Sequence, residues 1–204
     1  MKKNYLLGIL FFSALWGMSE TILGGVLYRA HISYSSVPLT IIAFIILTIA
    51  RVYLPNKGSS TLIASIAMLY KFLNTPFFAC HLLGIFCLGL SYDMLFSFLK
   101  IKNKTLFALL TTYLGYMLFA LTITYVFRYH YWIQEGFPRI LRHVGIGGTM
   151  AAIGNAILVH AVLNRVQALK QKTAGFFELK PALAAGSLSL ITAGLWVIAA
   201  ARCF

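Results

Sequence analysis

Acidic residues are scarce in this chain. Only 4 of its 204 residues are aspartate or glutamate, charged residues of both signs make up 10%, and 60% of the residues are hydrophobic. That hydrophobic share exceeds the roughly 45–50% of an ordinary soluble domain. The mean hydropathy is also high, at +0.85. The composition therefore excludes a soluble globular class and predicts a protein that lies mainly in lipid.

Cysteine is rare, and the common catalytic motifs are absent. The three cysteines, Cys80, Cys87 and Cys203, form no C-x-x-C pair, so the sequence indicates neither a thiol redox motif nor a structural zinc site. There is also no metalloprotease H-E-x-x-H, P-loop, G-x-S-x-G or dinucleotide-binding motif. We therefore predict no catalytic residue, no metal site and no cofactor.

Long apolar segments occupy most of the chain. A helix needs about 20 mainly apolar residues to cross a hydrocarbon core of about 30 Å. Seven segments approach this length, at residues 4–24, 37–52, 59–74, 77–98, 105–127, 144–164 and 182–201. The third is the weakest because Lys71 lies within it and Pro76 follows it. The predicted fold is an all-α integral membrane protein, a compact bundle of six to seven transmembrane helices in a single domain.

The basic residues favour a cytoplasmic N-terminus. If Met1 is inside, eleven of the 17 lysines and arginines fall on the same side and six on the other. Cytoplasmic loops carry the excess of Lys and Arg, so we expect a multi-pass protein of the prokaryotic cytoplasmic (inner) membrane. Because the cations lie in short clusters between apolar spans, we assign the net charge of +13 to orientation and to contact with the lipid bilayer, not to nucleic acid.

The N-terminal segment also has features of a signal peptide. Lys2 and Lys3 precede an apolar stretch, but Ser13, Ala14 and Gly17 match the small-residue cleavage pattern poorly. We expect the segment to be retained as the first helix.

Polar residues near the external helix ends form the candidate ligand site. At about 1.5 Å per residue, Glu20 lies roughly 24 Å from the inner end of its helix, and His81 lies at the same level. Ionisable groups inside a bilayer are costly and usually functional. Cations outnumber carboxylates here, which favours a small anionic or zwitterionic ligand. The candidate ligand-binding residues are Glu20, Arg29, His31, His81, Arg128, Trp132, Glu135, Arg142, His143 and Asn155.

Several of these residues have a purely structural alternative. Glu20 fits an interfacial ion pair with Arg29 or Arg142, and Asn155 fits an interhelical hydrogen bond. The predicted external loop 128–143 fits either an interfacial aromatic segment or a lid over a cavity.

One further acidic residue lies at the other end of the bundle. Asp93 is placed near the inner face, where we expect Lys100 or Lys102 to pair with it.

Small residues four positions apart indicate where helices contact one another. Three such faces occur, at residues 13, 17 and 21, at 148, 152 and 156, and at 185, 189 and 193. Most faces of this kind close a bundle. The first, formed by Ser13, Gly17 and Thr21, is also our candidate for docking a partner subunit.

Four stretches of the sequence resemble helices of a known family. They are WGMSETILGGVL (16–27), the apolar segments within 38–73, HLLGIFCLGLSYDML (81–95) and GGTMAAIGNAILVHAVLNRV (147–166). Together they resemble the substrate-binding S component of energy-coupling factor transporters, over about residues 5–168. The resemblance implies a six-helix core at 1–168, a ligand site near the external face, and docking through helix one onto a membrane scaffold subunit driven by ATPase subunits. Residues 169–204 then form an additional C-terminal transmembrane helix.

The predicted function is a membrane-embedded substrate-capture subunit of a vitamin or micronutrient uptake transporter. Two alternatives remain: a membrane redox enzyme that binds haem or a metal through embedded histidines, and a non-catalytic assembly subunit. For the haem, His81 and His160 are expected at depths that differ by roughly 15 Å, too far apart to ligate one iron.

Overall fold

The computed structural model describes residues 2–73, 79–99, 101–179 and 181–201, and helices are the only regular elements within these ranges. The α-helices are α1 (Lys2–Arg29), α2 (Ser36–Tyr53), α3 (Ser59–Ala67), α4 (Ala79–Met94), α5 (Lys104–Leu121), α6 (His130–Glu135), α7 (Phe137–Arg142), α8 (Thr149–Leu179) and α9 (Pro181–Ala201). The shorter turns are the 3₁₀ helix η1 (Met68–Leu73) and the π-helical segments η2 (Leu95–Leu99), η3 (Thr122–Val126) and η4 (His143–Gly148). Pro76, Lys100 and Cys203 lie outside the described residues.

Several helix ends follow from local chemistry. The Asn103 side chain accepts a hydrogen bond from Leu106 N at 3.1 Å and so caps the first turn of α5. Gly58 precedes α3 in the left-handed region at φ +82°, which glycine adopts without a Cβ clash. Gly136, at φ +57°, separates α6 from α7, and Pro138 lies in the first turn of α7.

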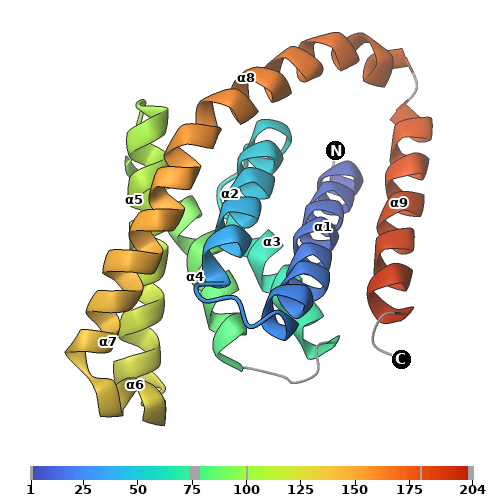
Figure 1. Cartoon of the computed structure of the whole chain (residues 1–204). Coiled ribbons are helices and arrows are strands. Elements are labelled where there is room, and N and C mark those ends of the chain that lie inside the picture. The colour runs from blue at the N-terminus through green and yellow to red at the C-terminus, as the bar shows by residue number, and fades with distance from the viewer. Residues whose placement is uncertain (1, 74–78, 100, 180, 202–204) are drawn as a thin grey trace.

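Six of the helices form a closed ring. α1 contacts α2, α2 contacts α8, α8 contacts α5, α5 contacts α4, α4 contacts α3, and α3 returns to α1 (Figure 1). The side chains at its centre form the main core, which includes Trp16, Phe44, Leu47, Ile63, Tyr92 and Phe107. Each of the six helices therefore has two neighbours within the ring, and four of them, α1, α2, α4 and α5, line the cavity described below.

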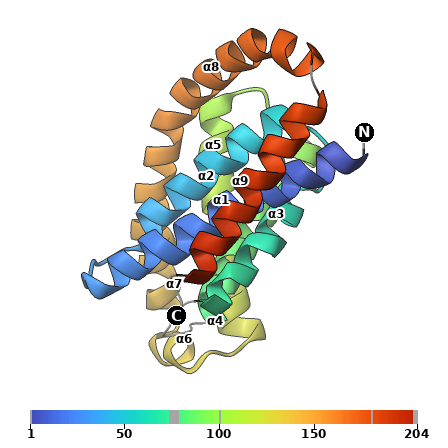
Figure 2. The ribbon, with the colours of Figure 1, turned by 90° about the vertical axis from the view of Figure 1, so that its right-hand side faces the viewer.

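The last two helices extend beyond this ring. The C-terminal half of α8 arches over the end of the bundle where α1 begins (Figure 1), and α9 then lies along α1 (Figure 2). Tyr70 of η1 and Trp196 of α9 pack with ring centroids 4.4 Å apart. α9 is thus an addition to the six-helix ring, attached through α1 and η1.

Five described helical segments are long and apolar enough to cross a membrane, as expected for a multi-pass membrane protein. They are Asn4–Arg29, Ser36–Tyr53, Cys80–Ser97, Lys104–Val126 and Phe137–Gln171. The sequence predicted six to seven. The third predicted span falls short because α3 and η1 contribute nine and six residues, against about 20 for a full crossing. α9 has 21 residues. Its described apolar stretch, Ser189–Ile198, is shorter than a full membrane crossing.

The outer surface of these helices is rich in large apolar side chains. Phe72, Val126 and Ile157 each expose more than 60% of their surface. Soluble monomers seldom expose broad apolar patches, so lipid is the natural solvent for this surface.

The sequence predicted a long loop at 128–143, but most of this segment is helical. It forms the short helices α6 and α7, and the chain continues through η4 directly into α8. This helical tip projects past the neighbouring ends of α1 and α4 (Figures 1 and 2). Gly136 and Pro138 lie in the middle of this segment, and residues of these types are typical of turns.

Candidate functional site

A cavity of about 770 Å³ lies between α1, α2, η1, α4 and α5. Its walls come from the C-terminal half of α1, the beginnings of α2 and α4, and the end of α5, so it occupies one end of the helical ring. This is the end that the charge distribution predicts to be external. Small-molecule sites usually have volumes of about 300–1,000 Å³, and this cavity is within that range.

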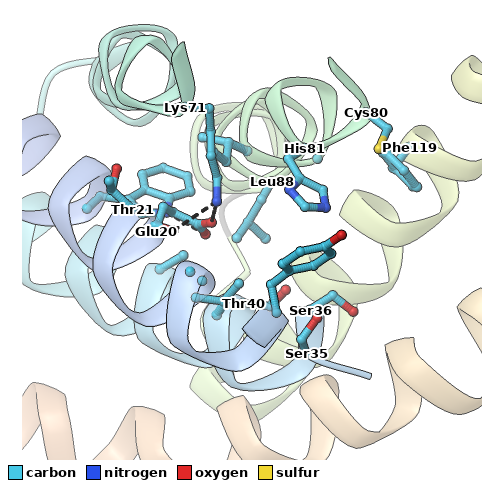
Figure 3. Close-up of a pocket in the computed structure, with 18 of the residues that line it drawn as sticks. Glu20, Thr21, Ser35, Ser36, Thr40, Lys71, Cys80, His81, Leu88 and Phe119 are labelled. Atoms are coloured by element: carbon cyan, nitrogen blue, oxygen red, sulfur yellow. Dashed lines mark hydrogen bonds and ion pairs between the residues drawn. The ribbon is translucent and has the colours of Figure 1, made fainter. Parts of the chain in front are cut away.

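A buried ion pair forms one wall. Lys71 Nζ lies 2.9 Å from Glu20 Oε2 and also donates to the backbone oxygen of Glu20 at 2.9 Å. Trp16 Nε1 donates to Glu20 Oε1 at 3.4 Å. Figure 3 shows the Lys71 ammonium directed at Glu20 from the neighbouring helix. Glu20 therefore pairs with Lys71, and not with Arg29 or Arg142 as the structural alternative predicted.

The remaining walls supply neutral hydrogen-bonding groups. Ser35 and Ser36, at the start of α2, line the cavity with Thr40 one turn later. The Thr40 and Tyr116 hydroxyl oxygens lie 3.4 Å apart. His81 of α4 points into the space between these groups and the ion pair (Figure 3). Hydrogen-bonding groups from three helices therefore converge on one volume.

The cavity carries an excess of positive charge. Arg29 lines its rim near the end of α1, where its Nε donates to Gly25 O at 3.4 Å. Arg29 and Lys71 are the lining cations apart from histidine, and Glu20 is the one lining carboxylate among the described residues. One cationic group is therefore left without a carboxylate in the cavity, which favours an anionic ligand group.

His143 is held in an aromatic cluster beside the cavity. Its ring centroid lies 4.8 Å from that of Tyr116, 5.1 Å from Phe119 and 5.2 Å from Trp132. The cluster joins the ends of α5 and α6 to η4. Trp132 therefore contributes by packing behind the wall, while His143, Tyr116 and Phe119 form part of the wall itself.

Four of the ten predicted ligand-binding residues line the cavity, namely Glu20, Arg29, His81 and His143. The other six lie outside its lining, namely His31, Arg128, Trp132, Glu135, Arg142 and Asn155. His31 and Arg128 are exposed residues with positive φ, in the turns that follow α1 and η3.

Glu135 and Arg142 form a separate polar group on the projecting tip. Glu135 Oε1 lies 2.9 Å from Arg139 Nη1, and its other oxygen accepts from Arg142. These side chains are substantially exposed. Glu135 thus pairs with both arginines outside the cavity lining.

Asn155 takes the structural alternative. It is fully buried in α8, and its Nδ2 donates to Thr112 Oγ1 of α5 at 2.9 Å. It therefore links two helices of the ring.

The predicted docking face of α1 is covered within the chain. Ser13 and Thr21 are buried, and Thr21 Oγ1 donates to the backbone oxygen of Tyr70 at 3.3 Å. A Cβ added at Gly17 would collide with the Tyr70 ring. In this structure, packing against η1 accounts for the small residues at 17 and 21, whereas Ser13 Oγ donates to Ile9 O of α1 at 2.7 Å. Partner docking through these residues stays a prediction.

Comparison with known proteins assigns no family. No protein-family model, curated protein or solved structure matches the chain. The function is therefore inferred from the chemistry of the cavity.

Lys71 is the main cavity residue that the ligand prediction omitted. The signal was present, because a lysine inside an apolar predicted span is costly and usually functional. The hydroxyl residues Ser35, Ser36 and Thr40 carried no comparable signal. Ser and Thr hydroxyl groups readily form hydrogen bonds to nearby backbone groups, so their presence in a helix does not indicate a ligand.

The embedded histidines do not meet. His81 lines the cavity, whereas His160 of α8 lies 2.8 Å from Thr105 Oγ1, near the beginning of α5 and thus toward the opposite end. Among the described residues, no cluster of three or more His, Cys, Asp or Glu side chains is placed to hold a metal ion.

Proposed function

We propose that this protein is a membrane-embedded capture subunit that binds a small anionic or zwitterionic nutrient in the cavity between α1, α2, η1, α4 and α5. The observation that carries the proposal is a ligand-sized cavity, about 770 Å³, with the buried Lys71–Glu20 pair on one wall and Arg29 at its rim. Buried charges that line a cavity inside an apolar bundle are expensive. A ligand with complementary charges gives them a use beyond packing.

The lining defines the class of ligand. Arg29 and Lys71 suit a carboxylate or phosphate, because hydrogen bonds between ionised groups are the stronger ones. Glu20 suits the ammonium group of a zwitterion, and the hydroxyl groups near the start of α2 suit a polar edge. Trp16, Leu39, Leu88 and Phe119 also line the cavity and offer contact to an apolar or aromatic body.

We place this capture step in vitamin or micronutrient uptake across a prokaryotic inner membrane, with a cytoplasmic N-terminus. The closed six-helix ring, with α9 added outside it, is consistent with the six-helix core and extra helix that the resemblance to the S components implies. In this proposal α3 with η1, and also α9, complete the crossings. Energy comes from a membrane scaffold subunit and ATPase subunits, as the resemblance to the S components implies. The absence of a nucleotide-binding motif from this sequence agrees with that arrangement.

Native mass spectrometry of the detergent-purified protein tests the proposal. We expect a retained small molecule in the wild-type spectrum. Arg29→Gln should reduce its retention by roughly tenfold or more, because a hydrogen bond to a charged group contributes about 1.5–3 kcal/mol. Arg29 is exposed, so its replacement leaves the helix packing intact.

Arg142→Gln is the matched control. It removes the same charge near the same end of the molecule, but Arg142 pairs with Glu135 outside the cavity lining. Equal retention in the wild type and in both variants would place the ligand elsewhere. A clean apo mass in all three, with no adduct after incubation with candidate nutrients, would favour an assembly role.

A further inference from the structure

A second cavity lies at the opposite end of the helical ring. It has a volume of about 580 Å³ and lies between the end of α2, the turn after it, η2, the beginning of α5 and the middle of α8. It shares no lining residue with the first cavity. The two cavities are therefore separate candidate sites.

The charge of this second cavity is strongly positive. Its lining includes Arg51, Lys57, Lys102 and Lys104, and among the described residues no carboxylate lines it. Asp93, which lies just behind the wall, pairs with Arg51. The two other acidic residues with described side chains are paired in or near the opposite end. Three lysines therefore face the cavity without a carboxylate partner among the described side chains.

Arg51 is held in a fixed orientation at the cavity wall. One carboxylate oxygen of Asp93 accepts a hydrogen bond from Arg51. The other oxygen accepts hydrogen bonds from Thr61 N at 2.6 Å and from Thr61 Oγ1 at 2.7 Å. The Phe96 ring lies 4.3 Å from the guanidinium carbon. Asp93 therefore pairs with Arg51, and Lys102, one of its two expected partners, lines the cavity instead. Lys100, the other expected partner, lies outside the described residues.

Two polar groups on this wall lack a partner. Within the described part of the chain, the buried atoms Arg51 Nε and Ser97 Oγ make no hydrogen bond. A buried donor without an acceptor is unfavourable. α5 also begins at this wall with Lys104 and has no acidic residue in its first turn, and the positive end of a helix dipole favours an anion.

We propose that the second cavity binds a phosphate group. A phosphate offers several acceptor oxygens to an arginine and neighbouring lysines at once. The lining also includes the apolar side chains of Ile101, Phe107, Val159 and Leu163, which would contact an acyl chain. The phosphate therefore comes either from the headgroup of an anionic phospholipid or from a soluble phosphate compound, and the test separates the two sources.

The experiment uses delipidated full-length protein in detergent. Native mass spectrometry measures binding of added dioleoyl phosphatidylglycerol, with phosphatidylcholine as the lipid control, and calorimetry measures binding of inorganic pyrophosphate. The double variant Lys102→Gln, Lys104→Gln should weaken binding of the phosphate probe about tenfold, as expected when two cations near an anionic group are lost. The control Arg165→Gln, Lys170→Gln removes two charges from the same end outside the cavity lining.

The two probes distinguish a lipid phosphate from a soluble one, and two results would overturn the proposal. Site-dependent binding of phosphatidylglycerol assigns a lipid headgroup, and site-dependent binding of pyrophosphate assigns a soluble phosphate. The proposal is overturned if neither probe binds, or if both double variants bind as the wild type does. Retention of the nutrient in the first cavity should be unchanged in the Lys102, Lys104 variant, so the outcome is independent of the proposed function.

Discussion

Neutralising one partner of the buried Lys71–Glu20 pair should destabilise the protein more than neutralising both. The two side chains expose 4% and 9% of their surface, and their charged atoms lie 2.9 Å apart. Glu20→Gln leaves a lysine ammonium without its carboxylate, and Lys71→Met leaves a carboxylate without its ammonium. The double variant leaves no buried charge at this position.

The distance sets the size of the effect. At 2.9 Å and an effective dielectric constant of about 20, the attraction is about 6 kcal/mol. Desolvation of the two charges offsets much of it, so the pair as a whole contributes little net stability. Removing one partner keeps the desolvation cost of the other, and we expect each single variant to lose about 3–5 kcal/mol. The double variant should lose less than either single one.

Reversible unfolding by SDS in mixed micelles, followed by tryptophan fluorescence, measures these free energies as a double-mutant cycle. Glu135→Gln is the control, because Glu135 pairs on the exposed tip, where an ion pair contributes about 0–1 kcal/mol. If the double variant loses the sum of the two single losses, the two groups are not coupled and the reasoning fails.

Two further substitutions test the packing of the ring. Gly17→Leu places a side chain against the Tyr70 ring and should lower the free energy of unfolding by about 2–3 kcal/mol, whereas Gly145→Leu should have little effect because a Cβ there meets no atom within 4 Å. Equal stability of the two variants in SDS unfolding would contradict the α1–η1 contact. Asn155→Ala removes the hydrogen bond to Thr112 and should cost about 0.5–1.5 kcal/mol without changing nutrient retention in native mass spectrometry. Lost retention would instead assign Asn155 to the ligand.

The end of the bundle at which the first cavity lies could be predicted largely from the positions of residues along the sequence. Glu20 and Arg29 lie late in an outward-running helix, and His81 lies early in an inward-running one, so the rise per residue brings them to the same end. All three line the cavity. His31 was predicted by the same reasoning and lies outside the lining, because position along the helix axis does not determine which way a side chain in a turn points.

The ion-pair partners could not be predicted in this way. Glu20 pairs with Lys71 and Asp93 with Arg51, although the sequence offered several cations at each level. The choice depends on how far each helix is rotated about its axis and on which helices are neighbours. Small changes in either exchange one partner for another at the same depth.

The sequence by itself determined the solvent and the long apolar helices, because the free energy of placing an apolar segment in lipid depends mainly on its composition and length. It also determined which end of the bundle is rich in cations. Only the tertiary structure decided that six helices close into a ring, that Gly17 and Thr21 of α1 face Tyr70, and that a cavity lies at each end of the ring. These features depend on side chains distant in sequence meeting at specific rotations, and a packed interior accepts few such arrangements.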